Sequence, residues 1–391
     1  MTVTVIGCDG HPPGPDAIKA LAEARTVIGA PRHLEAAPIG EHAQRNELRH
    51  LDQALDAITA HEGPIVVLAS GDPGFFGIVR ALRARGIVPA VIPAVSSVAL
   101  AFARLGLDWD DALVVSAHGR DPRKALAAAL PHPKAAILTA PGTASDLAGQ
   151  LLAAGKRVYI AERLGQPGER VIAFSAATDP ADPNILISLD QDKATPSEPR
   201  WLAGHQGAPD GWALPEDAFA HRDSMITKAE VRALVLARLG PGPGQVIWDV
   251  GAGSGSVAVE CARFGAHVIA IEADQAQCER IRQNAAQHQV RVQLRTGRAP
   301  EALDDLPPAD AVFAGGGDHT VLDAAIRHAN PRRIVVTLAA VSRVAETAAL
   351  LTAHGYQAGG VQLQASRLRD LPNAQLRLAA ENPVFVLWGA R

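Results

Sequence analysis

The sequence predicts an α/β protein built in two halves, and three observations support this fold class. Apolar, β-branched runs alternate with Ala-rich stretches of helical period from Thr2 to about Ser188, and the alternation resumes after residue 215. The stretch between the halves is rich in Pro, Gly, Asp and Gln and has no periodicity. A glycine-rich turn follows a strand in the second half. We therefore expect one domain over 1–190, a linker over 191–215 and a second domain over 216–391.

Composition narrows the class of protein. A chain of 391 residues with 48% hydrophobic and 20% charged residues is long enough for two or three globular domains. The formal net charge is −4, so the protein has no overall positive charge that would attract nucleic acid. Three cysteines are too few for a disulfide framework, and no Cys/His cluster has zinc-site spacing. With no signal peptide or membrane-length apolar run, we expect a cytoplasmic protein without metal, membrane or nucleic-acid partners.

The first half predicts mainly parallel strands that alternate with helices. The expected helices include 48–61 and 78–85, and the final part, 170–174 and 184–189, is typical of a β-hairpin. The expected strands are 3–6, 65–69, 90–92, 113–116, 136–139 and 158–161. Because strands joined by helices run parallel, their following loops should meet at one edge of a sheet.

The second half predicts a doubly wound sheet. Thr227 and Glu230 form a capping-box pattern that begins a helix over 228–239. The tail, at 360–365 and 384–388, has two extended runs without a crossover helix between them, which predicts an antiparallel pair at the sheet edge. The expected strands are 246–250, 268–271, 290–294, 311–314 and 334–338, and the expected helices are 257–264, 275–288, 320–328 and 344–354.

The turn at residues 249–255 carries the clearest chemical signal. Its sequence, Asp-Val-Gly-Ala-Gly-Ser-Gly, joins an apolar strand to a helix, and its glycines let the backbone turn sharply and approach a ligand. Seventeen residues past Gly255, Glu272 ends the next strand, where a carboxylate can accept hydrogen bonds from a ribose diol. The G-x-G-x-x-G spacing of dinucleotide-binding proteins fails in both registers, which argues against a nicotinamide oxidoreductase.

This strand, turn and acid resemble the first motif of Rossmann-like S-adenosylmethionine methyltransferases. The resemblance implies a seven-stranded sheet, Glu272 as the acid that binds the ribose, Ala299 beside the adenine and Gly316 near the methyl acceptor. It also implies that Thr227, in a Met-x-Thr-Lys element, contacts the cofactor. The residues of the turn implied to hold S-adenosylmethionine are Asp249, Gly251, Ala252, Gly253, Ser254 and Gly255.

Loops of the first half resemble those of the tetrapyrrole (corrin and porphyrin) methyltransferase family. A Gly-Asp-Pro loop follows the second expected strand, a Val-Ser-Ser element follows the third, and similar loops follow the others. The resemblance covers about residues 2–190 and implies two α/β lobes that hold S-adenosylmethionine between them. The first loop, at residues 7–14, departs from the family's usual Gly-x-Gly-Pro-Gly form. The residues implied to contact the cofactor are Gly71, Asp72, Pro73, Ser96 and Ser97.

Together the halves resemble the fused, decarboxylating precorrin methyltransferases of cobalamin synthesis. The resemblance implies methylation of precorrin-6B at carbons 5 and 15 and loss of the C-12 acetate carboxyl group, giving precorrin-8. We also expect a homo-oligomer, and we identify no general base. The alternative is that only the second half is catalytic and the first half docks substrate or a partner. Because the tetrapyrrole is a polycarboxylate, the candidate substrate cations are Arg120, Arg163, Arg343, Arg367 and Arg369.

Overall fold

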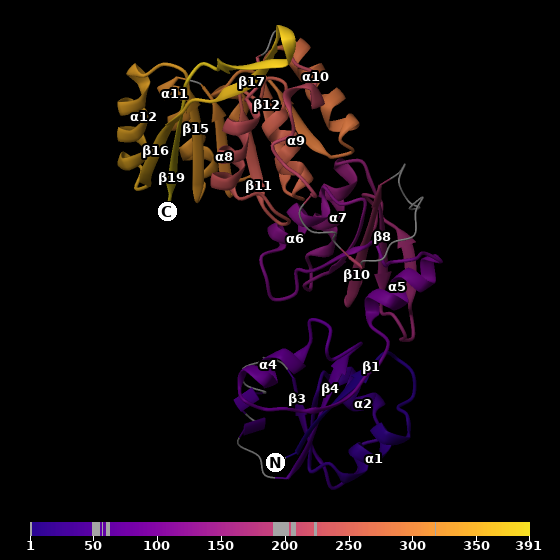
Figure 1. Cartoon of the computed structure of the whole chain (residues 1–391). Coiled ribbons are helices and arrows are strands. Elements are labelled where there is room, and N and C mark those ends of the chain that lie inside the picture. Colours follow the sequence, from indigo (N-terminus) through magenta and orange to yellow (C-terminus); the bar gives the residue numbers. More distant parts are fainter. Residues whose placement is uncertain are drawn as a thin grey trace. The chain divides into compact units, whose positions relative to one another are not determined.

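The structure is a computed structural model, and it describes residues 2–48, 55–56, 58–59, 63–190, 203–204, 209–222, 225–316 and 318–391 (Figure 1). The chain divides into two compact units, residues 1–122 with 133–204 and residues 123–132 with 205–391. Most of the expected 191–215 linker and of the expected 48–61 helix lies outside the described residues. The predicted mixed α/β class is confirmed. Among the described residues, no helix has the length and apolar character needed to cross a bilayer.

The first lobe of unit 1 is a parallel five-stranded sheet in the order β3-β2-β4-β1-β5. Its strands are β1 (Thr2–Cys8), β2 (Thr26–Gly29), β3 (Gln44–Glu47), β4 (Pro64–Ser70) and β5 (Ala90–Ile92), and its helices include α1 (Pro15–Glu23), α2 (Pro31–Ala36) and α4 (Ile78–Ala84). Apolar side chains of β1 and β4 alternate between two separate cores, as a sheet covered on both faces requires. The carboxyl ends of β1 and β4 therefore lie side by side.

The second lobe corrects one prediction. Its sheet has the order β6-β7-β10-β8-β9. The two segments expected to form a hairpin, β9 and β10, do not pair with each other; both pair antiparallel with β8, and β10 also pairs with β7. All seven residues of β10 are buried, which fits a central strand rather than an edge hairpin. The elements are β6 (Leu113–Ser116), β7 (Lys134–Leu138), β8 (Lys156–Glu162), β9 (Arg170–Ala173), β10 (Asn184–Asp190), α5 (Ser97–Leu105) and α7 (Ala144–Ala153).

Unit 2 contains a seven-stranded sheet in the order β13-β12-β11-β14-β15-β19-β16. The first five strands pair in parallel, while β19 pairs antiparallel with both β15 and β16. The predicted antiparallel pair at the sheet edge is therefore confirmed. The strands are β11 (Val246–Val250), β12 (His267–Glu272), β13 (Val292–Thr296), β14 (Ala311–Gly315), β15 (Arg333–Leu338), β16 (Gln357–Leu363) and β19 (Val384–Ala390).

Helices cover both faces of this sheet, as the pink-to-yellow part of Figure 1 shows. One core packs the sheet against α11 and α12, and the other packs it against α8, α9 and α10. The buried indole of Trp248 belongs to the first core, and its neighbour Ile247 belongs to the second. The helices are α8 (Ala229–Leu239), α9 (Ser256–Arg263), α10 (Gln275–Gln287), α11 (His319–Ala329) and α12 (Ser342–Ala353).

The start of α8 differs from the predicted capping box. Lys228 is the N-cap residue, and no side chain of the predicted box caps the helix. The carboxylate of Glu216, in the short 3-10 helix η1 (Glu216–Ala218), instead accepts a hydrogen bond from the Ala229 N–H at 2.9 Å. A carboxylate is a good cap there because the first N–H groups of a helix have no partner within it.

A two-stranded hairpin was not predicted. The strands β17 (Ser366–Leu371) and β18 (Gln375–Ala380) pair only with each other among the described residues. Leu368 and Leu378 face each other across this ribbon and are 65% and 67% exposed. The hairpin therefore presents aliphatic side chains to the solvent.

Candidate functional site

The glycine turn of unit 2 has the backbone that its sequence predicts. Gly251, Gly253 and Gly255 have φ values of +70°, +57° and +74°, a conformation that side chains other than glycine rarely adopt. A Cβ on Gly255 would lie 2.9 Å from the Ile281 side chain, so this glycine allows α9 and α10 to pack. A Cβ on Gly253 would meet no atom within 4 Å. The middle of the turn is therefore open and can receive a ligand.

Glu272 lies directly against this turn. Its Oε2 accepts a hydrogen bond from the Gly253 N–H at 2.7 Å, and its Oε1 accepts bonds from Ala273 and Asp274 N–H at 2.9 Å each. The carboxylate is thus fixed at the carboxyl end of β12, beside the open part of the turn. The structure brings the predicted turn and the predicted ribose acid together.

Asp249 lies below the turn and is 1% exposed. Its Oδ2 accepts a hydrogen bond from the Ala258 N–H at 2.9 Å, while its Oδ1 has no hydrogen-bond partner among the described residues. Burial raises the pKa of this carboxyl group to about 7; the Ala258 hydrogen bond opposes the rise and the nearby Glu272 adds to it. Asp249 therefore fixes the first turn of α9 beneath the ligand space.

Two further predicted loops border the same edge of the sheet. The loop after β13 is tied to β12 because the Gly297 N–H donates to the Glu272 carbonyl at 2.8 Å, and Ala299 packs against the sheet core. After β14, Gly316 has a φ of +88° with no atom within 4 Å of a Cβ position. The nearest atom to a Cβ on Gly251 is the carbonyl oxygen of Gly315, at 3.9 Å. Gly317 lies outside the described residues.

A buried ion pair holds the segment that contains Thr227. Arg232 and Glu260 are both fully buried and lie 3.3 Å apart, and a second nitrogen of Arg232 donates to the Thr227 carbonyl at 2.5 Å. Arg232 also donates to the Leu214 carbonyl, while Glu260 accepts from the Leu214 N–H. Neither residue was predicted, although a charged residue on the apolar face of a helix is the signal that could have identified each.

Asn284 connects this segment to the glycine turn. Its side chain donates to the Ser254 carbonyl at 2.8 Å and to the Ala220 carbonyl at 3.0 Å, and it accepts from the Ala220 N–H at 2.7 Å. Ser254 is itself buried. The predicted Ser254 and Thr227 are therefore each held by a buried polar side chain, Ser254 by Asn284 and Thr227 by Arg232.

The predicted arginines of unit 2 have different surroundings. Arg367 donates to both oxygens of Glu216 and to both oxygens of Glu230, at 2.6–3.0 Å. Its guanidinium is thus occupied by protein carboxylates, and we do not count it among the cations proposed for the substrate. Arg343 lies near Asp318, whose pKa is lowered mainly by the Val321 N–H and in part by Arg343.

In unit 1, three predicted loops lie in contact. The Gly71 N–H donates to the Cys8 carbonyl at 2.7 Å, and a Cβ on Gly7 would lie only 2.6 Å from the Gly71 carbonyl oxygen. A Cβ on Gly71 would lie 3.2 Å from the Ser97 nitrogen. The loops after β1, β4 and β5 therefore converge, as their position after neighbouring parallel strands predicts.

Side chains in these loops mainly support the backbone. Asp72 accepts a hydrogen bond from the Gly74 N–H at 2.7 Å, and Ser96 caps α5 by accepting from the Ala99 N–H at 3.1 Å. A Cβ on Gly77 would lie 2.3 Å from the Pro73 carbonyl oxygen, so the loop closes tightly on itself.

The two predicted arginines of unit 1 come from the second lobe. The Arg120 guanidinium lies over the ring of Phe76, 5.4 Å from its centroid, and so reaches the Gly-Asp-Pro loop of the first lobe. Arg163 has a φ of +49°, and its exposed side chain lies near Gly168 of its own loop.

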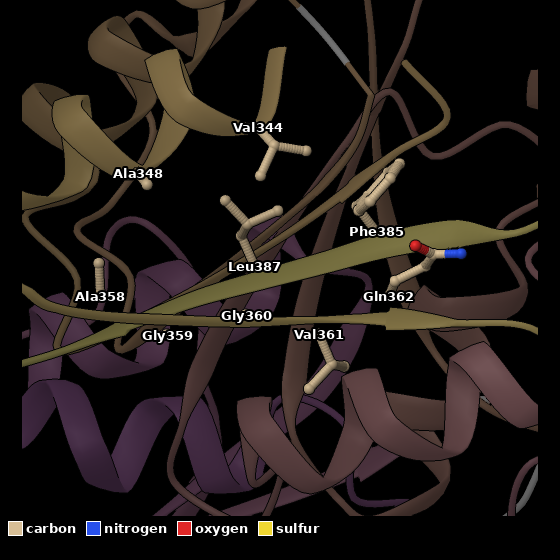
Figure 2. A pocket seen from close by; sticks show the side chains of 9 residues that line it. All are labelled: Val344, Ala348, Ala358, Gly359, Gly360, Val361, Gln362, Phe385 and Leu387. Carbon is tan, nitrogen blue, oxygen red and sulfur yellow. The ribbon is translucent and has the colours of Figure 1, made fainter. Parts of the chain in front are cut away.

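Two cavities were not predicted. One, of about 250 Å³, lies at the carboxyl end of β1 and includes Cys8, Arg32 and His33. The other, of about 350 Å³, lies between α12 and the edge strands of unit 2. Figure 2 shows Val344 and Ala348 of α12 above Leu387 of β19. Because no charged side chain lines the second cavity, it offers packing space rather than groups for catalysis.

Comparison with known proteins agrees with this arrangement in two halves. Residues 11–178 match the tetrapyrrole (corrin/porphyrin) methylases, and residues 217–385 match the precorrin methyltransferase domain. A solved structure of precorrin-6y C5,15-methyltransferase from Geobacter metallireducens GS-15 is 30% identical, covers 46% of this chain and 97% of that chain, and has a TM-score of 0.43.

Two relatives match over most of their length. A precorrin-6Y C(5,15)-methyltransferase (decarboxylating) from a Sinorhizobium species is 39% identical over 83% of this chain and 81% of its own. A protein of the same name from Mycobacterium tuberculosis (strain ATCC 25618 / H37Rv) is 34% identical over 76% of this chain and 75% of its own. On this likeness, the chain belongs to the family of decarboxylating precorrin-6Y C(5,15)-methyltransferases.

Proposed function

We propose that this protein uses S-adenosylmethionine to methylate precorrin-6B, also called precorrin-6Y, at carbons 5 and 15. It also removes the C-12 acetate carboxyl group as CO₂, and the product is precorrin-8. Unit 1 methylates carbon 5, and unit 2 methylates carbon 15 and decarboxylates. Membership of the family supports the reaction. The observation that carries the proposal is the open turn at Gly253 with the Glu272 carboxylate fixed against it.

The residues of unit 2 fit S-adenosylmethionine. A ligand can approach the backbone at Gly253 and Gly316, because a Cβ at either position would lie in open space. Glu272 can accept a hydrogen bond from a ribose hydroxyl, since a carboxylate offers about four acceptor positions and three are used here. In unit 1 the proposal of a donor site rests on the loops at Gly7, Gly71 and Ser97, which converge after neighbouring strands.

The chemistry needs alignment more than acid–base catalysis. The sulfonium of S-adenosylmethionine supplies an activated methyl group. The protein holds the reduced tetrapyrrole so that a nucleophilic ring carbon lies in line with that methyl group, and it excludes water. When the acetate side chain loses CO₂, the conjugated macrocycle accepts the electron pair of the broken bond. Arg120, Arg163, Arg343 and Arg369 are the cations that we propose for the substrate's carboxylates.

We further infer a two-lobed tetrapyrrole methylase fold over 1–190, a linker over 191–215 and a Rossmann-like methyltransferase over 216–391. The seven-stranded order with an antiparallel β19 supports the second assignment, and the two five-stranded lobes support the first. The three cysteines, Cys8, Cys261 and Cys278, are all free thiols, which supports a reducing cytoplasmic location.

We also propose that the protein is a homo-oligomer that associates through the β17–β18 hairpin. Leu368, Leu376 and Leu378 are 65%, 58% and 67% exposed on this ribbon, and an exposed aliphatic patch of this kind is typical of an interface. Light scattering should report more than one chain per particle for the wild-type protein. The Leu368→Gln, Leu378→Gln double variant should shift toward the monomer, and an unchanged mass would refute this interface.

Product analysis tests the main proposal. The full chain is mixed with precorrin-6B and S-adenosylmethionine, and mass spectrometry with NMR locates each new methyl group. The wild-type protein should add two methyl groups and release one CO₂. Gly253→Val should add a methyl group at carbon 5 alone, and Gly71→Val at carbon 15 alone, with decarboxylation. Unchanged methylation at carbon 5 in Gly71→Val would favour the docking alternative for unit 1, and no methylation by the wild-type protein would refute the proposal.

A further inference from the structure

The cavity of about 250 Å³ in unit 1 is lined by both lobes. The first lobe contributes the end of β1 and one side of α2, and the second lobe contributes the loop at Gly165–Pro167. The cavity is smaller than the 300–1,000 Å³ that are usual for whole small-molecule ligands. It therefore has room for one arm of a large ligand rather than for a macrocycle.

Two polar side chains that line this cavity, Arg32 and His33, both contact the hydroxyl of Ser70. Nη2 of Arg32 donates to Oγ of Ser70 at 2.7 Å, and Nε2 of His33 lies 2.8 Å from the same oxygen. Arg32 can only donate, so the Ser70 hydroxyl accepts from it and can donate to a neutral His33. Within the described part of the chain, the other guanidinium nitrogens of Arg32 have no hydrogen-bond partner. The side chain is oriented by Ser70 and still has donors for a ligand.

The charge of the cavity favours an anion. No Asp or Glu side chain lines it, and no described carboxylate forms an ion pair with Arg32. Burial raises the pKa of the Cys8 thiol to about 11, and burial together with Arg32 lowers the pKa of His33 to about 4. Both groups are therefore neutral near pH 7. The nearby Asp9 does not line the cavity, and the His11 and Val95 N–H groups donate hydrogen bonds to its carboxylate.

We propose that Arg32, oriented by Ser70 and His33, binds one side-chain carboxylate of the tetrapyrrole that unit 1 methylates. The inference rests on the proposed function and adds a substrate-binding residue to it. A planar guanidinium recognises a carboxylate through two parallel N–H donors, and the small cavity fits a single acetate or propionate arm. Because both lobes line the cavity, such an arm would be held between them.

Steady-state kinetics of methylation at carbon 5 tests this assignment in the full chain. Arg32→Gln should raise the KM for precorrin-6B about 10- to 100-fold, the range expected for loss of a charged hydrogen bond, with a smaller change in kcat. Arg32→Lys should restore part of the affinity, because lysine keeps the positive charge but lacks the two parallel N–H donors of the guanidinium. The wild-type KM should rise with salt more steeply than that of Arg32→Gln.

The matched control is Arg80→Gln, which removes the same charge from the exposed surface of α4 in the same lobe. It should leave both constants unchanged. Methylation at carbon 15 by the Arg32→Gln protein reports that the chain is folded and should equal that of the wild type. A KM for Arg32→Gln equal to that of Arg80→Gln would overturn the inference.

A failure of the proposed function would be visible separately. If the wild-type protein adds no methyl group at carbon 5, the proposed function fails for unit 1. Equilibrium binding of precorrin-6B then decides the inference. Weaker binding by Arg32→Gln than by Arg80→Gln would support the carboxylate site, and equal binding would refute it.

Discussion

Gly10 and Gly165 meet backbone to backbone where the two lobes of unit 1 touch. A Cβ on Gly10 would lie 1.6 Å from the Gly165 carbonyl oxygen, and a Cβ on Gly165 would lie 1.7 Å from the Asp9 carbonyl oxygen. Both residues also have positive φ values, +93° and +72°. Any side chain at either position would therefore force the lobes apart, and both glycines line the cavity that contains Arg32.

Gly10→Ala should accordingly weaken catalysis by unit 1. We expect methylation at carbon 5 to fall by at least tenfold and the free energy of unfolding to fall by about 1–3 kcal/mol, because the clash is with backbone. Gly155→Ala is the control: it has a similar φ of +77° but open space around the Cβ. Product analysis and chemical denaturation measure the two effects. Equal methylation at carbon 5 and equal unfolding free energy in both variants would show that the close contact at Gly10 affects neither catalysis nor stability.

Gly253→Ala tests the donor site of unit 2. The new Cβ would enter the space beside Glu272 without touching protein, so the fold should remain while donor binding weakens. Calorimetry on the full chain should count two S-adenosylmethionine molecules per wild-type chain and one per variant chain. Gly355→Ala, with a φ of +81° and open surroundings outside the site, should still bind two. Two bound molecules in Gly253→Ala would contradict the assignment.

The stability of the protein should depend on pH through Asp249. Burial raises the pKa of this carboxyl group from 3.8 to about 7, so between these pH values the folded chain holds a proton that the unfolded chain has lost. The stability that the neutral group contributes is therefore lost as pH rises through about 7. Asp249→Asn cannot ionise. Relative to the wild type, it should gain about 2.5 kcal/mol of unfolding free energy between pH 5 and pH 8. Urea denaturation in the absence of S-adenosylmethionine measures both free energies of unfolding. A difference between the two proteins that does not change with pH would contradict the prediction.

Arg367→Gln should reduce stability rather than substrate affinity. Hydrogen bonding to Arg367 lowers the pKa of Glu216 to about 2, so this pair contributes stability above the unfolded pKa of 4.5 and loses it as pH falls toward 2. We expect a loss of about 1–2 kcal/mol at pH 7, since Glu230 is partly exposed, and a smaller loss at pH 3.

Arg377→Gln is the control, because Arg377 is exposed on the paired strand, β18. Denaturation curves at both pH values measure the effect. A raised KM for precorrin-6B in Arg367→Gln alone, without a change in stability, would return Arg367 to the group of candidate substrate cations.

Local patterns predicted the glycine turn and most of the parallel strands. The turn at Gly251–Gly255 was predictable because its positive φ values require glycine at those positions, and the acid follows at a fixed spacing. The strands 246–250 and 334–338 were predictable because their buried β-branched runs are continuous. These features depend on residues that are close in the sequence.

Features that depend on the pairing of strands far apart in the sequence were either not predicted or predicted wrongly. The place of β10 between β7 and β8 is set by antiparallel partners far along the chain, and the strand's own sequence does not identify them. In β17 the leucines lie three positions apart among Ser, Arg and Asp, so this strand lacks the strict alternation of a half-buried strand. Two extended runs were predicted in the tail, where four strands occur, β16 to β19.

The site around Arg32 was missed because the strand before it was missed. β2 has only four residues, Thr26–Gly29, and the loop and helix after it were therefore not placed at the ligand edge of the sheet. Ser70 lies 38 positions beyond Arg32 in the sequence, so no local motif joins them. Arg232 and Asn284 are similar cases, since their partners come from other elements.

The network around Arg232 determines where the second half can be cut free of the first. A shortened protein that began at Lys228 would lack Leu214 and Thr227, whose carbonyls bind this guanidinium, and it would lack Ala220, which binds Asn284. Glu260 and Arg232 would then face water through an opened wall beneath the donor pocket. An expressed fragment that begins before residue 209 keeps this lining, and inhibitor screening or crystallisation of the isolated half should start from such a fragment.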